Sequence, residues 1–173
     1  RDIVKNLKTF SHVDEAELKY IDINETLETT LNIIRNELKY KVEIVKDYAK
    51  LSEIKCFPQK ISQVFMNILI NAAQAIEEKG TITIATSHSK EGRRAEDVKI
   101  KITISDTGKG IPEDEIIKIF DPFFTTKPVG EGTGLGLSIS YDIIKSHEGE
   151  ITVESQIGKG TSFTILLPLE TDI

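Results

Sequence analysis

The chain of 173 residues has a single cysteine, no tract of basic residues and no long apolar run. A membrane-spanning helix needs a run of about 18 apolar residues, so the sequence predicts none. One cysteine excludes a disulfide within the chain and fits a reducing, cytoplasmic location, which is compatible with a parent protein anchored in a membrane. The net charge of −6, without a basic tract, argues against nucleic acid as a partner.

Cys56 stands between Lys55 and Phe57, and we expect it to pack in the core rather than to act as a catalytic thiol. An apolar content of 39% and a charged content of 29% are ordinary for a soluble globular protein. The length suffices for one domain with a real core plus an appendage. The start at Arg1 suggests a fragment whose upstream region is missing.

Apolar spacing predicts a mixture of helices and strands. The capping-box pattern Asp22-x-x-Glu25 opens a helix that runs to residue 38. Pro58 opens another helix, which runs to Ile76. The remaining predicted elements are a helical stripe over 1–12, strands at 42–47, 81–86 and 98–105, a polar hairpin loop over 87–97, a short helix to 118, a helix ending near 149, and a closing hairpin of 151–155 and 161–167.

The helix that begins at Pro58 carries a polar stripe beside its apolar face. At about 100° per residue, Gln63, Asn67, Asn71 and Gln74 share this stripe. Asparagine is a mediocre helix former, so two of them four residues apart beside a buried edge need a reason. Either the stripe is a solvated flank of the helix, or its carboxamide oxygens are aimed at a cation or at phosphates.

Residues 106–112 read Asp-Thr-Gly-Lys-Gly-Ile-Pro and follow a predicted strand. A carboxylate at a strand end, Asp106, can accept a hydrogen bond from an amine. Gly108 and Gly110 have no Cβ, so the backbone can bend sharply there and a flat ring can lie against it. Taken alone, the segment is equally compatible with a plain strand-turn-helix connection.

Glycines alternate at positions 130, 132, 134 and 136, just before a predicted helix. Backbone N–H groups and a helix N-terminus together favour phosphate. No segment matches the P-loop pattern Gly-x-x-x-x-Gly-Lys-Ser/Thr, and this one lacks the third glycine and the preceding strand of the dinucleotide fingerprint. The alternative is a flexible linker, against which the alternation of glycine with leucine argues.

In this order, the segments resemble the catalytic ATP-binding domain of sensor histidine kinases, within the superfamily that includes gyrase, Hsp90 and MutL. The resembling segments are residues 63–75 (the N box), 106–112 (G1), 120–124, which read Phe-Asp-Pro-Phe-Phe (F), and 132–138 (G2). Four motifs in order are far more specific than any one. The variants Phe-Phe-Thr-Thr-Lys and Asn-Ala-Ala-Gln-Ala look most like the nitrogen-regulation subgroup.

The resemblance implies a two-layer α/β (α+β) sandwich, in which a mixed, mostly antiparallel sheet packs on about three helices with an ATP lid between them. It implies ATP and Mg²⁺ as ligands, with Asn71 as the magnesium ligand, Asn67 beside it and Lys127 at the phosphates, these three forming the catalytic group. Asp106 would accept from the exocyclic amine of adenine. Further nucleotide contacts are implied for Gly108, Gly110, Ile111, Gly132, Thr133, Gly134, Leu135, Gly136 and Leu137, and a water-mediated contact for Thr161.

Asn67 departs from the ATP-hydrolysing members, which place a glutamate there to activate water. An amide cannot take a proton at neutral pH, so rapid hydrolysis is disfavoured and the γ-phosphoryl group is expected to go to a histidine. The resemblance thus implies a protein-histidine kinase. Three alternatives stay open: an ATP-hydrolysing clamp of the gyrase or MutL type, an anti-sigma-factor serine kinase, and a module that has lost nucleotide binding.

The acceptor histidine of the family, in His-Glu/Asp-x-x-x-Pro, has no match in this sequence. We expect His12, His88 and His147 to be surface residues. Residues 1–14 are interpreted as the C-terminal remnant of a dimerisation helix, and 15–173 as the catalytic domain. The implied partners are the dimerisation domain of the same protein and the receiver domain of a response regulator, and the parent protein is expected to be a homodimer.

Overall fold

The computed structural model describes residues 17–90, 98–128 and 132–170. Among these residues, no helix is long and apolar enough to cross a membrane. The elements are β1 (Lys19–Ile21), α2 (Ile23–Ile33), α3 (Arg35–Leu38), β2 (Val42–Tyr48), β3 (Ile54–Cys56), α4 (Pro58–Ala75), β4 (Gly80–Lys90), β5 (Val98–Asp106), α5 (Glu113–Ile116), α6 (Gly136–Ser146), β6 (Glu150–Gln156) and β7 (Gly160–Pro168).

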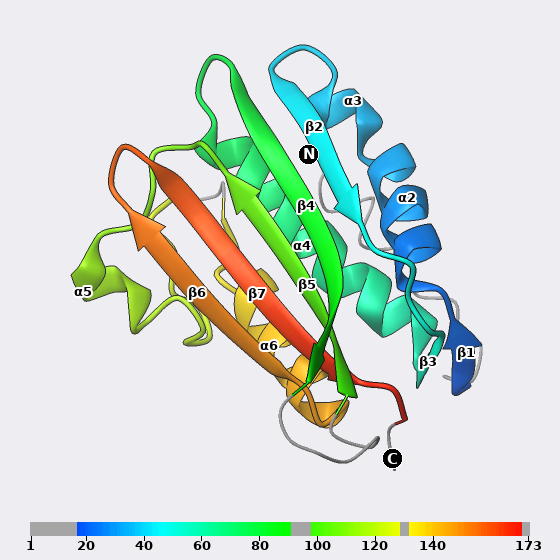
Figure 1. Ribbon diagram of the computed structural model, residues 1–173. Coiled ribbons are helices and arrows are strands. Elements are labelled where there is room, and N and C mark those ends of the chain that lie inside the picture. The colour runs from blue at the N-terminus through cyan, green and yellow to red at the C-terminus, as the bar shows by residue number, and fades with distance from the viewer. Residues whose placement is uncertain (1–16, 91–97, 129–131, 171–173) are drawn as a thin grey trace.

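The fold has two layers, a twisted sheet and a group of helices behind it (Figure 1). Five strands form the main sheet in the order β2-β4-β5-β7-β6. β2 runs parallel to β4, and the other neighbours are antiparallel. Helices α2, α4 and α6 lie against one face of this sheet (Figure 1). The predicted mixed, mostly antiparallel sheet packed on helices is therefore confirmed.

The core lies between the sheet and α4. In β5, Ile100, Ile102 and Ile104 are at most 1% exposed, while the intervening Lys101 is exposed. The buried face of α4 consists of Ile61, Val64, Phe65, Ile68, Leu69, Ala72 and Ala73. Burying a large aliphatic side chain stabilises a fold by roughly 1.5–3 kcal/mol. These contacts fix α4 along its whole length and thereby set the direction of its polar stripe.

Two of the predicted elements have different boundaries in the structure. The hairpin loop predicted over 87–97 begins later, because β4 continues to Lys90 and its last residues pair with the start of β5. The helix predicted to residue 38 is interrupted at Ile34, which separates α2 from α3. The helical stripe predicted over 1–12 and the boundary at residue 14 lie outside the described residues.

A two-stranded antiparallel sheet, formed by β1 and β3, was not predicted. Its strands are only three residues long, too short for alternation to be recognised. β3 leads directly into α4, and its last residue, Cys56, is 1% exposed. Burial raises the pKa of the Cys56 thiol to about 12. A protonated, buried thiol is a poor nucleophile, so the predicted packing role of Cys56 is confirmed.

The prediction that His147 lies on the surface is wrong, because its side chain is 0% exposed. Nε2 of the ring accepts the Phe57 N–H at 3.1 Å, and Nδ1 lies 2.7 Å from the Ile143 carbonyl oxygen. Since Nε2 accepts, Nδ1 carries the proton. Phe57 is the N-cap residue directly before α4, and its side chain makes no capping bond. The imidazole therefore satisfies one of the N–H groups that a helix start leaves unpaired.

Acidification is expected to destabilise the chain through His147. Burial lowers the pKa of this imidazole below its usual 6.5, the bond to the Ile143 carbonyl opposes this shift, and the charge of Lys60 adds a smaller lowering. As the pH falls through 6.5, His147 becomes protonated in the unfolded chain but stays neutral in the folded chain. The free energy of unfolding therefore falls. For the binding of one proton, the free energy of unfolding can fall by at most about 1.4 kcal/mol per pH unit.

Urea unfolding at pH 7.5 and pH 5 measures this dependence. His147→Gln should unfold at lower urea at pH 7.5 and show a shallower pH dependence than the parent chain. His88 is exposed, so His88→Gln serves as the control and should keep the full dependence. Equal pH dependence in the parent chain and in His147→Gln would contradict the assignment.

Candidate functional site

Asp106 ends β5 and is 8% exposed. Its carboxylate accepts the Gly108 N–H at 2.8 Å and a second backbone N–H from Thr161. Burial raises the pKa of Asp106 above its ordinary value, and the two N–H bonds oppose this shift. The carboxylate is thus held in a fixed direction at the end of the central strand, as a buried acceptor with few competing partners.

The turn after Asp106 is wedged between α4 and the hairpin of β6 and β7. A Cβ on Gly108 would lie 2.6 Å from the Ala75 carbonyl oxygen, and one on Gly110, where φ is +75°, would overlap the Gln156 carbonyl oxygen. The Lys109 N–H also donates to the Ala75 carbonyl at 3.0 Å. Only glycine permits this close approach at both positions. The turn is therefore anchored directly to the last turn of α4.

Three hydroxyl and amide groups form a small network beside Asp106. Ser155 Oγ accepts the Ile111 N–H at 2.8 Å and donates to the Gly160 carbonyl oxygen at 3.0 Å. Its remaining partner is Thr161 Oγ1, at 2.8 Å. Because the single hydroxyl hydrogen of Ser155 is directed at Gly160, Thr161 donates here and keeps its own lone pairs for another partner. An open hollow of about 450 Å³ adjoins Asp106, Ser155 and Thr161, and its other lining residues are Ser105, Glu154, Gln156, Lys159, Gly160 and Ser162.

The two asparagines of the polar stripe of α4 are half-buried and contact two later segments of the chain, while Gln74 is exposed. Asn67 Nδ2 donates to the Gly136 carbonyl oxygen at 2.9 Å and to Ser140 Oγ at 3.1 Å. Asn71 Oδ1 accepts from the Lys127 ammonium at 3.3 Å, and Lys127 also donates to Gln74. α4 therefore connects the second glycine segment, the segment of Lys127 and, through Ala75, the Asp106 turn.

The phenylalanine segment and the second glycine segment are held together. The Phe123 N–H donates to the Gly134 carbonyl oxygen at 2.9 Å. Gly134 has φ of +65°, and a Cβ there would overlap the Phe123 backbone. A Cβ on Gly132 would lie 2.6 Å from Thr125 Oγ1. The two segments close into one unit that covers the stripe of α4, while Gly130 lies outside the described residues.

Two lysines of the site repel one another. Burial, followed by the charge of Lys109, lowers the pKa of Lys127. The positive charge of the two side chains favours a ligand that carries negative charge. The Lys127 ammonium and the amide oxygens of Asn71 and Gln74 form a polar end of the site, distinct from the buried carboxylate of Asp106.

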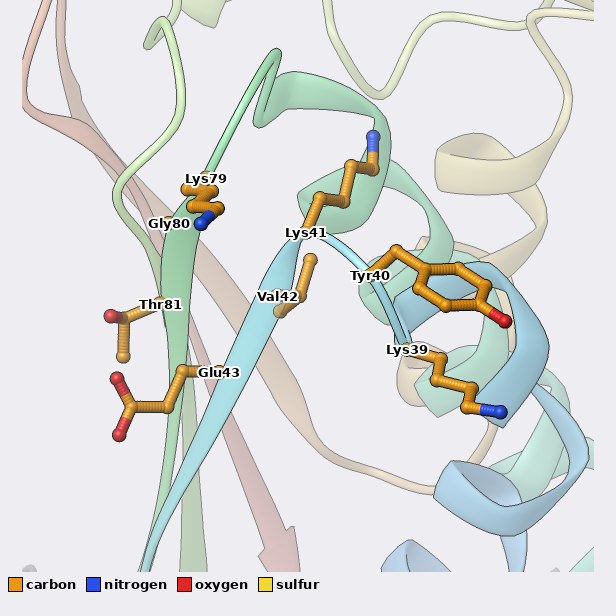
Figure 2. A pocket seen from close by; sticks show the side chains of 8 residues that line it. All are labelled: Lys39, Tyr40, Lys41, Val42, Glu43, Lys79, Gly80 and Thr81. Carbon is orange, nitrogen blue, oxygen red and sulfur yellow. The ribbon is translucent and has the colours of Figure 1, made fainter.

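A second hollow lies where β2 and β4 begin, and none of the predicted site residues line it. Figure 2 shows its lining side chains, among them Lys39, Lys41 and Lys79 around Val42. Lys41 donates to the Ile76 carbonyl oxygen at 2.9 Å and so belongs to the end of α4 rather than to a ligand. Within the described ranges, no group of three or more His, Cys, Asp or Glu side chains could hold a metal ion.

The structure thus brings Asn67, Asn71, Lys127 and Gly136 together at one end, and Asp106, Gly108, Gly110, Ile111 and Thr161 at the other. The hydroxyls of Ser140 and Ser155 were missed. Both sit at positions that the periodicity assigns to an apolar face, Ser140 with Ile143 and Ile144, and Ser155 with Ile151 and Val153. A lone polar residue on such a face is the signal that marks them.

Comparison with known proteins gives one family. Residues 57–171 match the family model described as histidine kinase-, DNA gyrase B-, and HSP90-like ATPase. The sensor histidine kinase ZraS of Escherichia coli (strain K12) is 38% identical over 154 residues, which is 88% of this chain and 31% of that protein. The histidine-protein kinase AtoS of the same strain is 37% identical over 169 residues, 96% of this chain and 26% of that protein.

Solved structures agree with this match. The catalytic domain of the histidine kinase ThkA, in a nucleotide-free form, is 30% identical with a TM-score of 0.74, covering 89% of this chain and 97% of that one. The mycobacterial sensor histidine kinase MprB has the same fold, with a TM-score of 0.76 at 23% identity, covering 90% of this chain and 99% of that one. The chain spans less than a third of the curated relatives named above. Because the family model covers most of the sequence, the chain belongs to the histidine kinase-, DNA gyrase B- and HSP90-like ATPase family.

Proposed function

We propose that this chain is the ATP-binding catalytic domain of a two-component sensor histidine kinase. It binds Mg²⁺-ATP and donates the γ-phosphoryl group to a histidine on the dimerisation domain of the same protein, from which the group passes to the receiver domain of a response regulator. The parent protein acts as a homodimer with this domain in the cytoplasm. The names of its relatives as sensor histidine kinases support this proposal.

The observation that carries the proposal is the division of the site into two unlike ends joined by α4. One end offers a single buried carboxylate acceptor, and the other offers the Lys127 ammonium and two amide oxygens. An adenine carries an amine that suits the first, and a triphosphate carries the charge that suits the second. Few ligands other than a nucleotide combine these requirements.

At the adenine end, Asp106 accepts from the exocyclic amine. Gly108 and Gly110 hold the turn against α4 and the β6–β7 hairpin, so that the backbone of the turn borders the ring. Ile111, half-buried against the core, contacts the ring. Thr161 offers its lone pairs to a water that bridges to the base. Leu137, which also packs partly against the core, lies on the other side of the ring. The fixed backbone bonds of Asp106 preorganise this acceptor before the nucleotide arrives.

At the phosphate end, the backbone of Gly132, Thr133, Gly134, Leu135 and Gly136 closes over the phosphates, and Lys127 supplies a mobile charge. Asn71 fits Mg²⁺, because its amide oxygen already accepts a hydrogen bond from a cation, the Lys127 ammonium. Amide oxygens suit this hard ion, which also keeps waters. Bound there, Mg²⁺ would neutralise charge on the phosphates.

Transfer to histidine is favoured over hydrolysis because Asn67 stands where the ATP-hydrolysing members place a glutamate. Asn67 directs its NH₂ group toward α6 and cannot take a proton from water. The γ-phosphoryl group is therefore transferred only when another domain supplies the nucleophile. Catalysis then consists of positioning and charge stabilisation. The described histidines do not serve as acceptors: His147 is buried with both ring nitrogens occupied, and His88 accepts from the Ser52 N–H.

Calorimetric titration of the chain with Mg²⁺-ATP tests the binding step. The expected result is saturable binding at one site. Mixing the loaded chain with a separately produced dimerisation domain should then transfer radiolabelled γ-phosphate to that domain, with little label on the chain itself. Absence of nucleotide binding would overturn the proposal. Steady-state hydrolysis at ordinary ATPase rates would instead favour the gyrase-like clamp.

Asn71→Ala is expected to weaken Mg²⁺-ATP binding roughly 10- to 100-fold, the range for losing a bond to a charged group. Binding of ADP without magnesium should change far less, because the side chain contacts the metal rather than the base. Gln74→Ala is the matched control: it also removes a partner of Lys127 but no proposed metal ligand, so it should affect the two nucleotides alike. Equal losses for both nucleotides in Asn71→Ala would count against metal ligation.

A further inference from the structure

Ser140 lies outside every sequence motif discussed above, yet its side chain is 0% exposed and in contact with the site. It is on the second turn of α6, and its Oγ lies 2.8 Å from the Gly136 carbonyl oxygen of the same helix. The same Oγ lies 3.1 Å from Asn67 Nδ2, and Nδ2 lies 2.9 Å from the Gly136 carbonyl. The hydroxyl, the carbonyl and the amide form a closed triangle between α4 and α6.

The chemistry of this triangle fixes the direction of the Asn67 carboxamide. A serine hydroxyl has one hydrogen, and here it is donated to the Gly136 carbonyl. Ser140 therefore presents only lone pairs to Asn67, and Gly136 presents a carbonyl. Both groups are acceptors, so they accept the two hydrogens of the NH₂ group. A flipped amide would place Oδ1 against the Gly136 carbonyl oxygen, and the Ser140 hydroxyl could donate to Oδ1 only by giving up its own bond to Gly136.

Fixing the NH₂ group also fixes the oxygen, which lies beside the start of α6, 3.7 Å from where a Cβ on Gly136 would stand. We propose that Ser140 is a positioning residue that orients the Asn67 carboxamide, so that Oδ1 is offered to the magnesium-phosphate part of the nucleotide. This inference rests on the proposed function of the site. Ser140 acts through Asn67 and touches neither metal nor nucleotide.

The same triangle joins the helix that carries the N box to the start of α6, where the second glycine segment ends. Asn67 contributes two donors to the protein and one acceptor to the ligand. An aspartate in its place would lose both donors. The Ser140 hydroxyl can then rotate to donate to the carboxylate, at the expense of its bond to Gly136, so the two residues are energetically coupled.

Calorimetry of Ser140→Ala with two ligands tests the proposal. Without the hydroxyl, the amide can turn, and the affinity for Mg²⁺-ATP is expected to fall roughly three- to tenfold, the range for one hydrogen bond. The affinity for Mg²⁺-free ADP should stay within about twofold. Thr30→Val is the control, because Thr30 is 1% exposed and its hydroxyl donates to the Thr26 carbonyl one turn earlier on α2, away from the site. This variant should leave both affinities unchanged.

A merely structural role for Ser140 would lower both affinities alike, and a role outside the site would lower neither; each of these results overturns the proposal. A double-mutant cycle adds a second test. Asn67→Asp should weaken Mg²⁺-ATP binding more in the Ser140→Ala background than in the parent chain, because no hydroxyl remains to donate to the carboxylate. Strict additivity of the two substitutions would contradict the coupling.

If Ser140→Ala does not fold, the side-chain amide signals of Asn67 in the NMR spectrum of the unsubstituted chain decide. Both Nδ2 hydrogens should be protected from exchange with solvent, and rapid exchange of either would overturn the orientation. This measurement needs no nucleotide. A chain that fails to bind Mg²⁺-ATP but shows protected Asn67 amides would refute the proposed function and leave the geometry of the triangle intact.

Discussion

Asp106→Asn is expected to abolish measurable binding of adenine nucleotides, a loss of roughly 100-fold or more, in a chain that remains folded. One carboxylate oxygen is committed to the Gly108 N–H. With an amide, the committed position needs the oxygen, so the NH₂ group faces the exocyclic amine of adenine, donor against donor. Turning the amide over moves the same conflict to Gly108. Neither orientation satisfies both partners.

The fold should tolerate this substitution, because the carboxylate carries a cost that the amide does not. Burial raises the pKa of Asp106, so ionisation of this group destabilises the folded state, and a neutral side chain of the same shape removes that effect. We expect the melting temperature to stay the same or to rise. Destabilisation at a binding site is a common cost of function.

Calorimetry and thermal unfolding of the same preparation measure both effects. Asp114→Asn provides the control, because Asp114 is exposed on α5, and it should change neither quantity. Unaltered nucleotide affinity in Asp106→Asn would remove the adenine assignment. Loss of the folded state would instead show that Asp106 serves stability.

Gly160→Ala should destabilise the fold by roughly 3 kcal/mol or more, as a strained backbone and a steric overlap add together. Gly160 begins β7 with φ of +112°, where a side chain is strained whatever the space. A Cβ there would also overlap the carbonyl oxygen of Asp106. The backbone can relieve the overlap only by moving the end of β5, so nucleotide affinity should fall together with stability.

Gly158 in the same turn separates the two causes. It has φ of +78°, but a Cβ there would meet nothing within 4 Å. Gly158→Ala therefore carries the backbone strain alone, about 1 kcal/mol, and should bind nucleotide normally. Urea unfolding of both variants gives the comparison. If Gly158→Ala and Gly160→Ala had similar stabilities, the overlap of a Cβ on residue 160 with the Asp106 carbonyl would not contribute to the destabilisation.

The elements that sequence reasoning predicted well are those with a strong local period. α4 was predicted to within a residue or two, because its apolar positions recur at helical spacing and proline opens it. The same periodicity placed Asn67 and Asn71 beside the buried face, where the structure has them. Family membership followed from the order of four short motifs, each weak when taken alone.

What the sequence could not predict depends on contacts between distant segments. His147 follows a helix in a polar stretch, which is typical of a surface residue, and it is buried only because the start of α4, 90 positions earlier, needs an acceptor there. The pairing of β1 with β3 brings together residues 19–21 and 54–56. Ser140 and Ser155 gain their roles from partners on other elements, so only the oddity of a polar residue on an apolar face marks them.

The sealed state of Cys56 has a practical consequence. The one thiol of the sequence is 1% exposed, with a pKa of about 12. Maleimide reagents at neutral pH will therefore not react with it. A cysteine introduced by Thr126→Cys, at an exposed position next to Lys127, would then be the sole point of dye attachment. Fluorescence from that label would report on the segment of Lys127 in single molecules, without any need to remove the native cysteine.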